Sequence, residues 1–403
     1  MKTEVLTTEL GKAAAILQNG GLVAVPTETV YGLAGNGLDE AAVRRIYEVK
    51  GRPSVKPLSL MVPGAEAMER YCLDVPPAAK LLAARFWPGP LTIVLKARPE
   101  IPGIVLAGGD TVGLRCPDHP QTLALLKEAG IPFAAPSANP SGEESPKTAG
   151  QVLAYFDGKI EAVLDGGPCG VGTESTLISL AATPYRILRQ GALDADVIAD
   201  ALADGLTVIG ITGGSGSGKT TALGELARRG ALVIDCDGVY HELLAHDRGL
   251  IGELETHFPG SVENGVLQRK KLGALVFSDA KALQKLNGIT HRYVSAAVAQ
   301  RLRDWAMHGG RVAAVDAIEL IGSGLAARCD LTVGILAPEQ ARVERIMERD
   351  QIAREYALLR VRAQPGDAYY RENCDCVLEN NGDRAQFADR FNQLIKERFP
   401  WMT

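Results

Sequence analysis

Residues 206–221 contain the pattern that most restricts how this chain can fold. The apolar run 206–212 is followed by Gly-Gly-Ser-Gly-Ser-Gly-Lys-Thr over 213–220, which fits GxxxxGK[ST], and then by a helical pattern over 221–229. In such a loop, glycines let consecutive backbone N–H groups curl around phosphate oxygens, and the helix N-terminus adds positive potential. The sequence therefore predicts an α/β domain with a nucleotide-phosphate site. Its residues are Gly213, Gly214, Ser215, Gly216, Ser217, Gly218, Lys219, Thr220 and Thr221.

Side chains around this loop supply the charges that phosphoryl transfer needs. We expect Lys219 to reach the β and γ phosphates and the Thr220 hydroxyl to hold Mg²⁺ that arrives with ATP. A later helical pattern, 338–350, carries arginines near one face, at 342, 345 and 349. These arginines either clamp ATP phosphates in a closing lid or pair with neighbouring glutamates on a solvated face.

Carboxylates follow two further predicted strands, 231–234 and 311–315. Open α/β sheets bind their ligands at this edge. Asp237 is the candidate base that accepts the proton of an acceptor hydroxyl, and its alternative is to cap the next helix; Asp235 is the weaker candidate. Asp316 either binds Mg²⁺, directly or through water, or is an ordinary strand-end residue.

The chain divides near residue 205. Residues 191–205 read as a short helix that ends at glycine, directly before the apolar run 206–212. Residues 1–205 hold 18 Lys+Arg against 23 Asp+Glu, which leaves 25 against 25 for 206–403. A formal net charge of −5 argues against a chain-wide basic surface for nucleic acid. We therefore expect two domains, 1–205 and 206–403, whose anion sites are local.

The lack of a recognisable targeting signal and the cysteine usage favour a cytoplasmic protein. The first residues include acids, no apolar run is long enough to span a bilayer, and the seven cysteines are scattered. We expect reduced thiols and no metal site at the Cys374/Cys376 pair.

Hydroxyl and basic residues gather in Gly/Pro-rich turns and at predicted strand ends of the first half. They occur in the segments 20–33, 50–58, 87–92, 111–117, 135–142, 173–176 and 187–191. Polar tips at such places can converge on a cleft above a rigid floor of strands. Five cations would together neutralise a nucleotide triphosphate and a substrate carboxylate: Lys50, Arg52, Lys56, Arg115 and Arg189. The alternatives are surface solvation for each cation and an Asx-type turn for Ser137 and Asn139.

In this order and spacing, these segments resemble the YrdC-type L-threonylcarbamoyladenylate synthases over residues 5–195. The resemblance implies a twisted open α/β sheet with a large cavity. There, L-threonine, bicarbonate and ATP, with Mg²⁺, would give pyrophosphate and threonylcarbamoyl-AMP, the precursor of a tRNA adenosine modification. The residues that match the nucleotide side are Lys50, Arg52, Lys56, Thr111, Ser137, Asn139 and Arg189, with Lys50 and Arg52 as catalytic candidates. Those that match the threonine side are Thr27, Thr29, Arg115 and Ser175.

The second half is similar to the dephospho-CoA kinases over nearly all of 207–403. The likeness rests on the blocks 210–221, 233–237, 269–277, 290–291, 345–350, 360–364 and 375–382. It implies a P-loop kinase with a parallel sheet and a helical lid, which transfers the γ-phosphate of ATP to the ribose 3′-hydroxyl of dephospho-CoA. By this resemblance Asp237 is the acceptor-side base, and Arg345, Arg349 and Arg360 belong to the ATP and lid side.

Three departures from these families affect the substrate contacts. The kinases usually have His-Pro where this chain has His291-Arg292, and a Pro-Leu-Leu-Phe-Glu type segment where it has 318–322; some synthases have a His at the place of Met61. His291 itself either contacts a substrate phosphate or packs in a helix.

We therefore expect a fusion of two ATP-using enzymes whose ligands are ATP, L-threonine, bicarbonate and dephospho-CoA, with no membrane or DNA partner. Direct contact with tRNA or with the later tRNA-modification proteins is left open. In one alternative, the second domain has a changed acceptor or a regulatory role. In the other, the first domain is an RNA-binding module without catalysis, although its charge of 18 − 23 = −5 argues against that.

Overall fold

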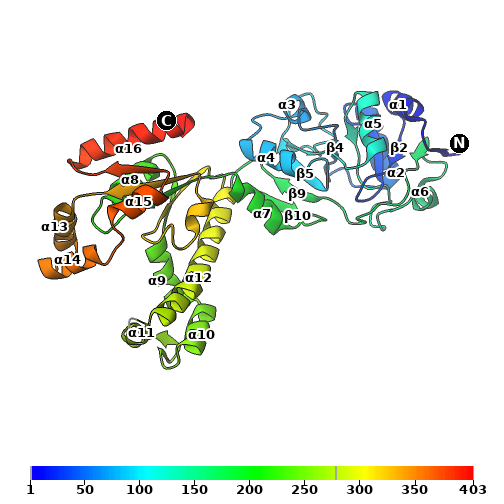
Figure 1. The fold of residues 1–403 in the computed structure, drawn as a ribbon. Coiled ribbons are helices and arrows are strands. Elements are labelled where there is room, and N and C mark those ends of the chain that lie inside the picture. Colours follow the sequence, from blue (N-terminus) through cyan, green and yellow to red (C-terminus); the bar gives the residue numbers. More distant parts are fainter. Residues whose placement is uncertain (1, 277–278, 403) are drawn as a thin grey trace. The chain divides into compact units, whose positions relative to one another are not determined.

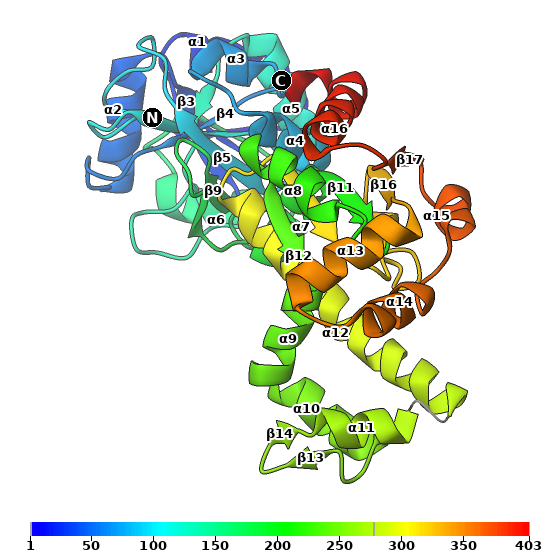
Figure 2. The same cartoon turned by 90° about the vertical axis from the view of Figure 1, so that its left-hand side faces the viewer.

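The computed structural model describes residues 2–276 and 279–402, so Phe277, the last residue of the 269–277 block, lies outside the described residues. The chain divides into two compact units, Met1–Gly205 with Met307–Gly309 and Leu206–Ala306 with Gly310–Thr403. Figure 1 and Figure 2 show the elements of each unit in two views. Across the described ranges, no helix is long and apolar enough to cross a membrane.

A mixed ten-stranded sheet of short strands forms the floor of the first unit. The strand order is β1-β8-β2-β3-β7-β4-β6-β5-β9-β10. The strands are β1 (Glu4–Leu6), β2 (Val23–Val25), β3 (Gly32–Asn36), β4 (Ser59–Met61), β5 (Leu91–Lys96), β6 (Thr111–Arg115), β7 (Phe133–Ala134), β8 (Ala162–Leu164), β9 (Thr176–Ser179) and β10 (Arg186–Arg189).

Helices of the first unit bury apolar stripes against this sheet. They are α1 (Leu10–Gln18), α2 (Glu40–Lys50), α3 (Ala67–Tyr71), α4 (Pro77–Phe86), α5 (Pro120–Ala129), α6 (Ala149–Phe156) and α7 (Ala195–Asp204). Helices α1 and α5 pack together, and Leu17, Leu125 and Phe133 belong to the core that they share with the strands. This core fixes the sheet below the loops.

The second unit is built on a five-stranded, all-parallel sheet in the order β12-β15-β11-β16-β17. Its strands are β11 (Thr207–Thr212), β12 (Leu232–Asp235), β15 (Val312–Asp316), β16 (Leu331–Leu336) and β17 (Cys376–Glu379). β11 is central, and its register places Ile211 opposite Asp316. The loop after β11 therefore begins in the middle of the carboxyl edge of the sheet, beside the acid that ends β15.

Helices of the second unit form three groups. The elements are α8 (Lys219–Arg228), α9 (Cys236–His246), α10 (Arg248–His257), the hairpin β13 (Val262–Glu263) and β14 (Val266–Leu267), α11 (Arg269–Val276), α12 (Ala280–Met307), η1 (Leu325–Arg328), α13 (Glu339–Asp350), α14 (Arg354–Arg362), α15 (Asp367–Asn373), α16 (Arg384–Arg398) and η2 (Pro400–Met402). Helices α8 and α16 contribute to the sheet core, α10 to α12 bury a core of their own, and α13 packs on α14 around Val343 and Val361.

The α/β class and the strands and helices expected around the phosphate loop are confirmed. The expected strand 206–212 is β11, the helix 338–350 is α13, and the helix that ends at Gly205 is α7. The seven cysteines are free thiols. Lys50 differs in detail, because it is the last residue of helix α2, and the turn begins at Gly51 in the left-handed region (φ 58°).

Candidate active sites

A polar pocket opens in the first unit where loops leave the sheet. Its lining consists of Val30, Gly32, Arg52, Pro57, Leu58, Ser59, Met61, Thr92, Arg115, Ala135, Pro136, Ser137, Glu174, Ser175, Leu177 and Arg189. The charged residues of the lining are three cations from separate segments, Arg52, Arg115 and Arg189, and one carboxylate, that of Glu174. The pocket is therefore suited to a ligand that carries several negative charges.

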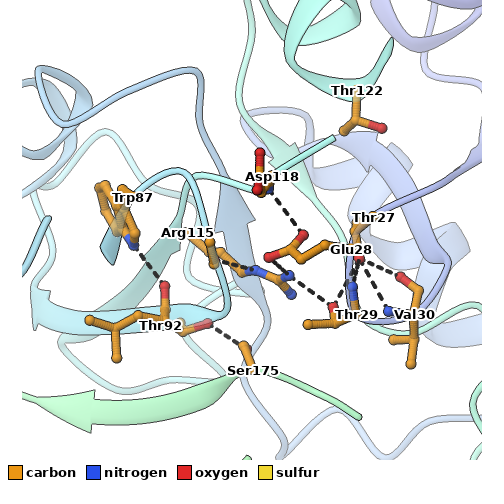
Figure 3. A network of polar contacts seen from close by, with 12 residues as sticks. Thr27, Glu28, Thr29, Val30, Trp87, Thr92, Arg115, Asp118, Thr122 and Ser175 are labelled. Carbon is orange, nitrogen blue, oxygen red and sulfur yellow. Dashed lines mark hydrogen bonds and ion pairs between the residues drawn. The ribbon is translucent and has the colours of Figure 1, made fainter. Parts of the chain in front are cut away.

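Arg115, at the end of β6, is fixed on three sides. Its Nη2 donates to Glu28 Oε1 at 2.7 Å and to Thr29 Oγ1 at 2.8 Å, and its Nε donates to the carbonyl of Gly89 at 3.3 Å. The other carboxylate oxygen of Glu28 accepts the backbone N–H of Asp118 at 3.0 Å. Figure 3 shows this network, in which Glu28 lies between Arg115 and Asp118. The guanidinium direction is thus set by the protein alone.

The two threonines before β3 build a turn behind Arg115. The Thr27 hydroxyl donates to the carbonyl of Val30 at 2.7 Å and accepts the N–H groups of Thr29 and Val30 at 3.1 and 3.2 Å. Both threonine side chains are buried, and their hydroxyls lie 2.9 Å apart. They shape the turn that presents Val30 and Gly32 to the pocket, and neither belongs to its lining.

Arg189 ties β10 to the segment before β9. Its Nη2 donates to the Ser175 carbonyl at 2.7 Å and to the Ser175 hydroxyl at 3.3 Å, while its Nη1 pairs with Glu174. The Ser175 hydroxyl also lies 2.8 Å from the Thr92 hydroxyl. These contacts hold two hydroxyls, one carboxylate and one guanidinium together at one wall of the pocket.

Lys50 is buried below the loop that carries Ser137 and Asn139. Its Nζ donates to the backbone carbonyls of both residues. Burial, together with the nearby charge of Arg52 and against an opposing effect of Glu174, lowers the pKa of Lys50 to about 8. Burial also lowers the pKa of Arg52, whose Nη2 donates to the Pro57 carbonyl at 3.1 Å. Lys50 therefore holds a wall of the pocket, whereas Arg52 faces into it.

The structure brings together part of the set that the sequence predicts. Arg52, Ser137, Arg115, Ser175 and Arg189 line one pocket. Five other predicted residues do not belong to the lining: Thr27, Thr29, Lys50 and Asn139, which are buried around it, and Thr111. Lys56 is exposed and also lies outside the lining.

Three residues near the pocket escaped the sequence analysis. They are Glu28, Thr92 and Glu174. Each lies in a segment that the sequence identifies as polar, but nothing in the sequence indicates the role of the residue itself. Their partners, Arg115, Ser175 and Arg189, come from distant positions, and spacing along the chain does not show such contacts.

In the second unit, the loop between β11 and α8 has the backbone that phosphate binding requires. Gly213 and Gly218 have φ values of 140° and 112°. A Cβ atom would meet the Ile335 carbonyl oxygen at 2.3 Å in the first case and Asn380 Nδ2 at 2.2 Å in the second. Only glycine fits at these two places. Lys219 begins α8, and its Nζ donates to the Gly213 carbonyl at 3.0 Å, which stretches the side chain back over the loop.

Residues after β16 hold this loop from outside. Arg342 Nε donates to the Ser215 carbonyl at 3.0 Å, Arg345 Nη1 to the Gly216 carbonyl at 3.0 Å, and Asn380 Nδ2 to the Ser217 carbonyl at 2.7 Å. These contacts satisfy three consecutive carbonyls from outside and fix the course of the loop. Within the loop, the Ser217 N–H donates to the Gly214 carbonyl at 3.1 Å.

Gln364, just after α14, fastens the same loop through Ser215. Its Oε1 accepts the Ser215 N–H at 2.8 Å and an N–H of Arg342 Nη2 at 2.8 Å, and its Nε2 donates to the Ser215 hydroxyl at 2.9 Å. Burial lowers the pKa of Arg342. Nothing in the spacing along the chain links Arg342 or Gln364 to Ser215, so neither contact is predictable from the sequence.

The remaining lid arginines have another partner. Arg349 donates to both carboxylate oxygens of Asp350, at 2.7 and 3.0 Å, and Arg360 pairs with the same carboxylate. Of the three predicted lid residues, Arg345 therefore contacts the phosphate loop, while Arg349 and Arg360 are held next to each other by Asp350. Among the described residues, no ion pair joins the arginines at 342, 345 and 349 to Glu339, Glu344 or Glu348, the pairing offered as the alternative.

Three carboxylates lie at the ends of β12 and β15. Asp235 caps α9, since its Oδ1 accepts the Asp237 N–H at 3.0 Å, so the capping role belongs to Asp235, and the Asp237 side chain is exposed. Asp316 Oδ1 is buried without a hydrogen-bond partner among the described residues. Burial raises the pKa of Asp316; with the opposing charge of Lys219 and the added effects of Asp235 and Asp237, the pKa is about 6.

The donor set fits a cation that arrives with a nucleotide. Within 2–276 and 279–402, no group of three or more His, Cys, Asp or Glu side chains could hold a metal ion by itself. However, the unpartnered carboxylate oxygen of Asp316 and the exposed Thr220 on the first turn of α8 supply hard oxygen ligands of the kind that Mg²⁺ prefers.

Each half of the chain matches a different family. Residues 15–191 match the Sua5/YciO/YrdC family, described as "Telomere recombination". Residues 207–386 match the CoaE family, described as "Dephospho-CoA kinase".

Curated relatives match the first half. The threonylcarbamoyl-AMP synthase of Halorhodospira halophila is 36% identical over 45% of this chain and 90% of the relative. Those of Pyrococcus abyssi and Bacillus subtilis are 47% and 46% identical over 46% and 47% of this chain, and both matches cover 55% of the relative. The chain thus spans about half the length of these two relatives. The chain belongs to the Sua5/YciO/YrdC family through its N-terminal half, and it is a fusion in which a dephospho-CoA kinase family domain follows.

Proposed function

We propose that the first unit makes threonylcarbamoyl-AMP and pyrophosphate from L-threonine, bicarbonate and ATP. The observation that carries this proposal is the pocket in which Arg115 lies with the cations Arg52 and Arg189. Arg115 would bind the threonine carboxylate, with Ser175 beside it, while Arg52 and Arg189 would bind the triphosphate. Ser137 would complete the nucleotide side, and Lys50 would hold the loop that carries it.

The proposed reaction depends more on the positioning of its reactants than on acid–base groups. The threonine nitrogen attacks the carbon of bicarbonate, one proton is lost from the ammonium group and water leaves, which gives a carbamate. A carbamate oxygen then attacks the α-phosphorus, and the bond to pyrophosphate breaks. The carbamate is short-lived in water, so a pocket that holds it against ATP gains more than a proton acceptor would. The cations Arg52 and Arg189 stabilise the charge that develops on pyrophosphate.

Pyrophosphate release by the purified full chain tests this proposal. With ATP, Mg²⁺, bicarbonate and L-threonine, we expect pyrophosphate together with a product of the mass of threonylcarbamoyl-AMP. Arg115→Ala should abolish the threonine-dependent release of pyrophosphate. No threonine-dependent pyrophosphate would contradict the proposal and favour the alternative of an RNA-binding module.

We propose that the second unit phosphorylates the 3′-hydroxyl of dephospho-CoA. The carrying observation is the phosphate loop with Lys219 on one side and the exposed Asp237 at the same sheet edge. Backbone N–H groups of the loop and Lys219 would bind the phosphates, and Asp237 would accept the proton of the attacking hydroxyl. Thr220 and Asp316 would hold the Mg²⁺ that comes with ATP, and this ion neutralises phosphate charge when bound.

CoA formation, followed by mass, tests the second activity. We expect the full chain with ATP, Mg²⁺ and dephospho-CoA to give CoA and ADP. A protein that binds ATP but forms no CoA would contradict this proposal and favour a changed acceptor or a regulatory role. Nucleosides and nucleotides offered as acceptors would then separate these two alternatives, since an intact phosphotransferase would modify one of them.

A further inference from the structure

The Glu28 carboxylate is the feature of the first unit that the proposed reaction leaves unused. Its side chain is 13% exposed and that of Arg115 is 8% exposed, so both charges have lost most of their water. A buried charge is costly unless it is paired and hydrogen-bonded. Glu28 meets this condition with one oxygen on Arg115 and the other on the Asp118 N–H. It does not belong to the pocket lining, so it reaches a ligand only through Arg115.

The pairing decides which edge of the Arg115 guanidinium is available. Glu28 and Thr29 occupy Nη2, and the Gly89 carbonyl occupies Nε. In the part of the chain that the structure describes, no hydrogen bond to Nη1 is found, and Arg115 lines the pocket. Figure 3 shows the guanidinium with Glu28 on one of its sides. The donors left for a ligand are therefore the two N–H groups of Nη1.

The same pair also changes the charge that a ligand meets. An isolated buried guanidinium would attract any small anion, including bicarbonate and pyrophosphate, both of which are present in the proposed reaction. With Glu28 2.7 Å from Nη2, the pair is close to neutral as a unit. Such a near-neutral pair attracts a simple anion much less than a lone guanidinium would. A zwitterion, which brings its own positive charge, loses little of its attraction in the same comparison.

We propose that Glu28 is a positioning residue of the amino-acid subsite, which aims Arg115 Nη1 at the substrate carboxylate and suppresses capture of other anions. This inference rests on the proposed synthase function. Glu28 acts through Arg115, and its effect therefore disappears when Arg115 is absent.

Glu161 offers a matched control in the same unit. Its carboxylate also accepts one backbone N–H, that of Leu22 at 2.7 Å, and one arginine, Arg45, at 2.9 Å. Its side chain is 26% exposed, and it does not line the pocket. Glu161→Gln therefore removes a comparable ion pair without touching the subsite.

The test measures L-threonine binding to the full chain by calorimetry, with wild type, Glu28→Gln, Glu161→Gln, Arg115→Met and the double variant Glu28→Gln/Arg115→Met. For Glu28→Gln we expect the Kd for L-threonine to rise at least tenfold, sulfate to become a stronger competitor of threonine, and the Kd for ATP to change less than twofold. Glu161→Gln should match wild type in all three. The double variant should bind threonine no more weakly than Arg115→Met alone.

Two results would overturn this inference while leaving the proposed synthase function intact. The first is that Glu28→Gln binds threonine as tightly as wild type, with the same sensitivity to sulfate. The second is that the double variant binds threonine more weakly than Arg115→Met. Wild-type protein that binds no threonine would overturn the proposed synthase function, and the inference with it. Should Glu28→Gln fail to fold, Glu28→Asp keeps the charge but is too short for both partners. It should then weaken threonine binding and raise sulfate competition to an intermediate degree, and an unchanged Glu28→Asp would also overturn the inference.

Discussion

The two candidate sites differ in what they are made of. The phosphate site of the second unit is mainly backbone, contiguous over 213–221, and its outer carbonyls are held by Arg342, Arg345 and Asn380. The pocket of the first unit is lined by residues that come from positions between Val30 and Arg189 along the chain. A backbone site binds what every nucleotide shares, while a side-chain pocket can recognise one small substrate. We therefore expect single substitutions to have different effects at the two sites.

The largest effect should separate chemistry from binding at the backbone site. Asp237→Asn should lower the turnover of CoA formation by about a thousandfold, because a positioned base contributes about 10²–10⁴. The Kd for ATP should stay within about twofold, since the loop backbone and Lys219 bind the phosphates. The control Asp235→Ala removes a helix cap and should cost about 1 kcal/mol of stability. Equal losses of turnover and ATP affinity in Asp237→Asn would mean that Asp237 is structural.

In the side-chain pocket, one buried residue should matter for both stability and activity. Lys50→Met leaves the carbonyls of Ser137 and Asn139 without their donor, at a cost of about 2–4 kcal/mol in unfolding free energy. Pyrophosphate release should fall by about a hundredfold, because a displaced wall disturbs positioning. Lys56→Met, at an exposed position outside the lining, should have a much smaller effect on both. Equal effects of the two substitutions would contradict the supporting role of Lys50.

The Asp316 carboxyl should make the unfolding free energy of the second unit depend on pH. Its folded-state pKa of about 6 lies above the usual value, so its contribution to stability is present at low pH and is lost as the pH rises through 6. Relative to Asp316→Asn, the wild-type unit should lose about 2 kcal/mol of unfolding free energy between about pH 4 and 7. Denaturant unfolding at several pH values measures this difference.

The titration of Asp316 itself is a second check on the same residue. A carboxyl NMR signal should show a midpoint near 6 in the ligand-free protein. Lys219→Met should raise this midpoint, and Asp235→Asn should lower it, because the first removes an opposing charge and the second a like charge. A midpoint near 4 that neither substitution moves would contradict the buried position of Asp316.

The smallest effect concerns the fastening of the phosphate loop by Gln364. Gln364→Ala removes two hydrogen bonds to Ser215, and we expect the KM for ATP to rise about threefold to tenfold, in line with about 1 kcal/mol. Gln340→Ala is the control, since the Gln340 amide donates to Glu344 on an exposed face, away from the loop. A lower KM in Gln364→Ala would show instead that Gln364 competes with the nucleotide for the Ser215 N–H.

The same contrast explains how much could be predicted from the sequence. The phosphate loop, its flanking strand and helix and the strand-end acids were predictable, because these features are local in sequence and follow from backbone requirements. Arg342 and Gln364 could not be linked to Ser215, since their contacts depend on how α13 and α14 return to the sheet edge.

For the side-chain pocket, the sequence indicated the right segments but not the place of each side chain. Lys50 is a case in point: its residue type suggested a phosphate contact, whereas the end of α2 buries it under the Ser137 loop. Glu28 stood between two singled-out threonines without a role, because Arg115 is far away in sequence. Long-range pairs of this kind require the fold.

Crossed assays of two full-length variants test the central claim, that two independent sites share this chain. CoA formation and threonine-dependent pyrophosphate release would be measured side by side for Lys219→Ala and Arg189→Ala. We predict that Lys219→Ala abolishes CoA formation and leaves pyrophosphate release within about twofold, and that Arg189→Ala does the reverse. Loss of both activities in either folded variant would contradict the account.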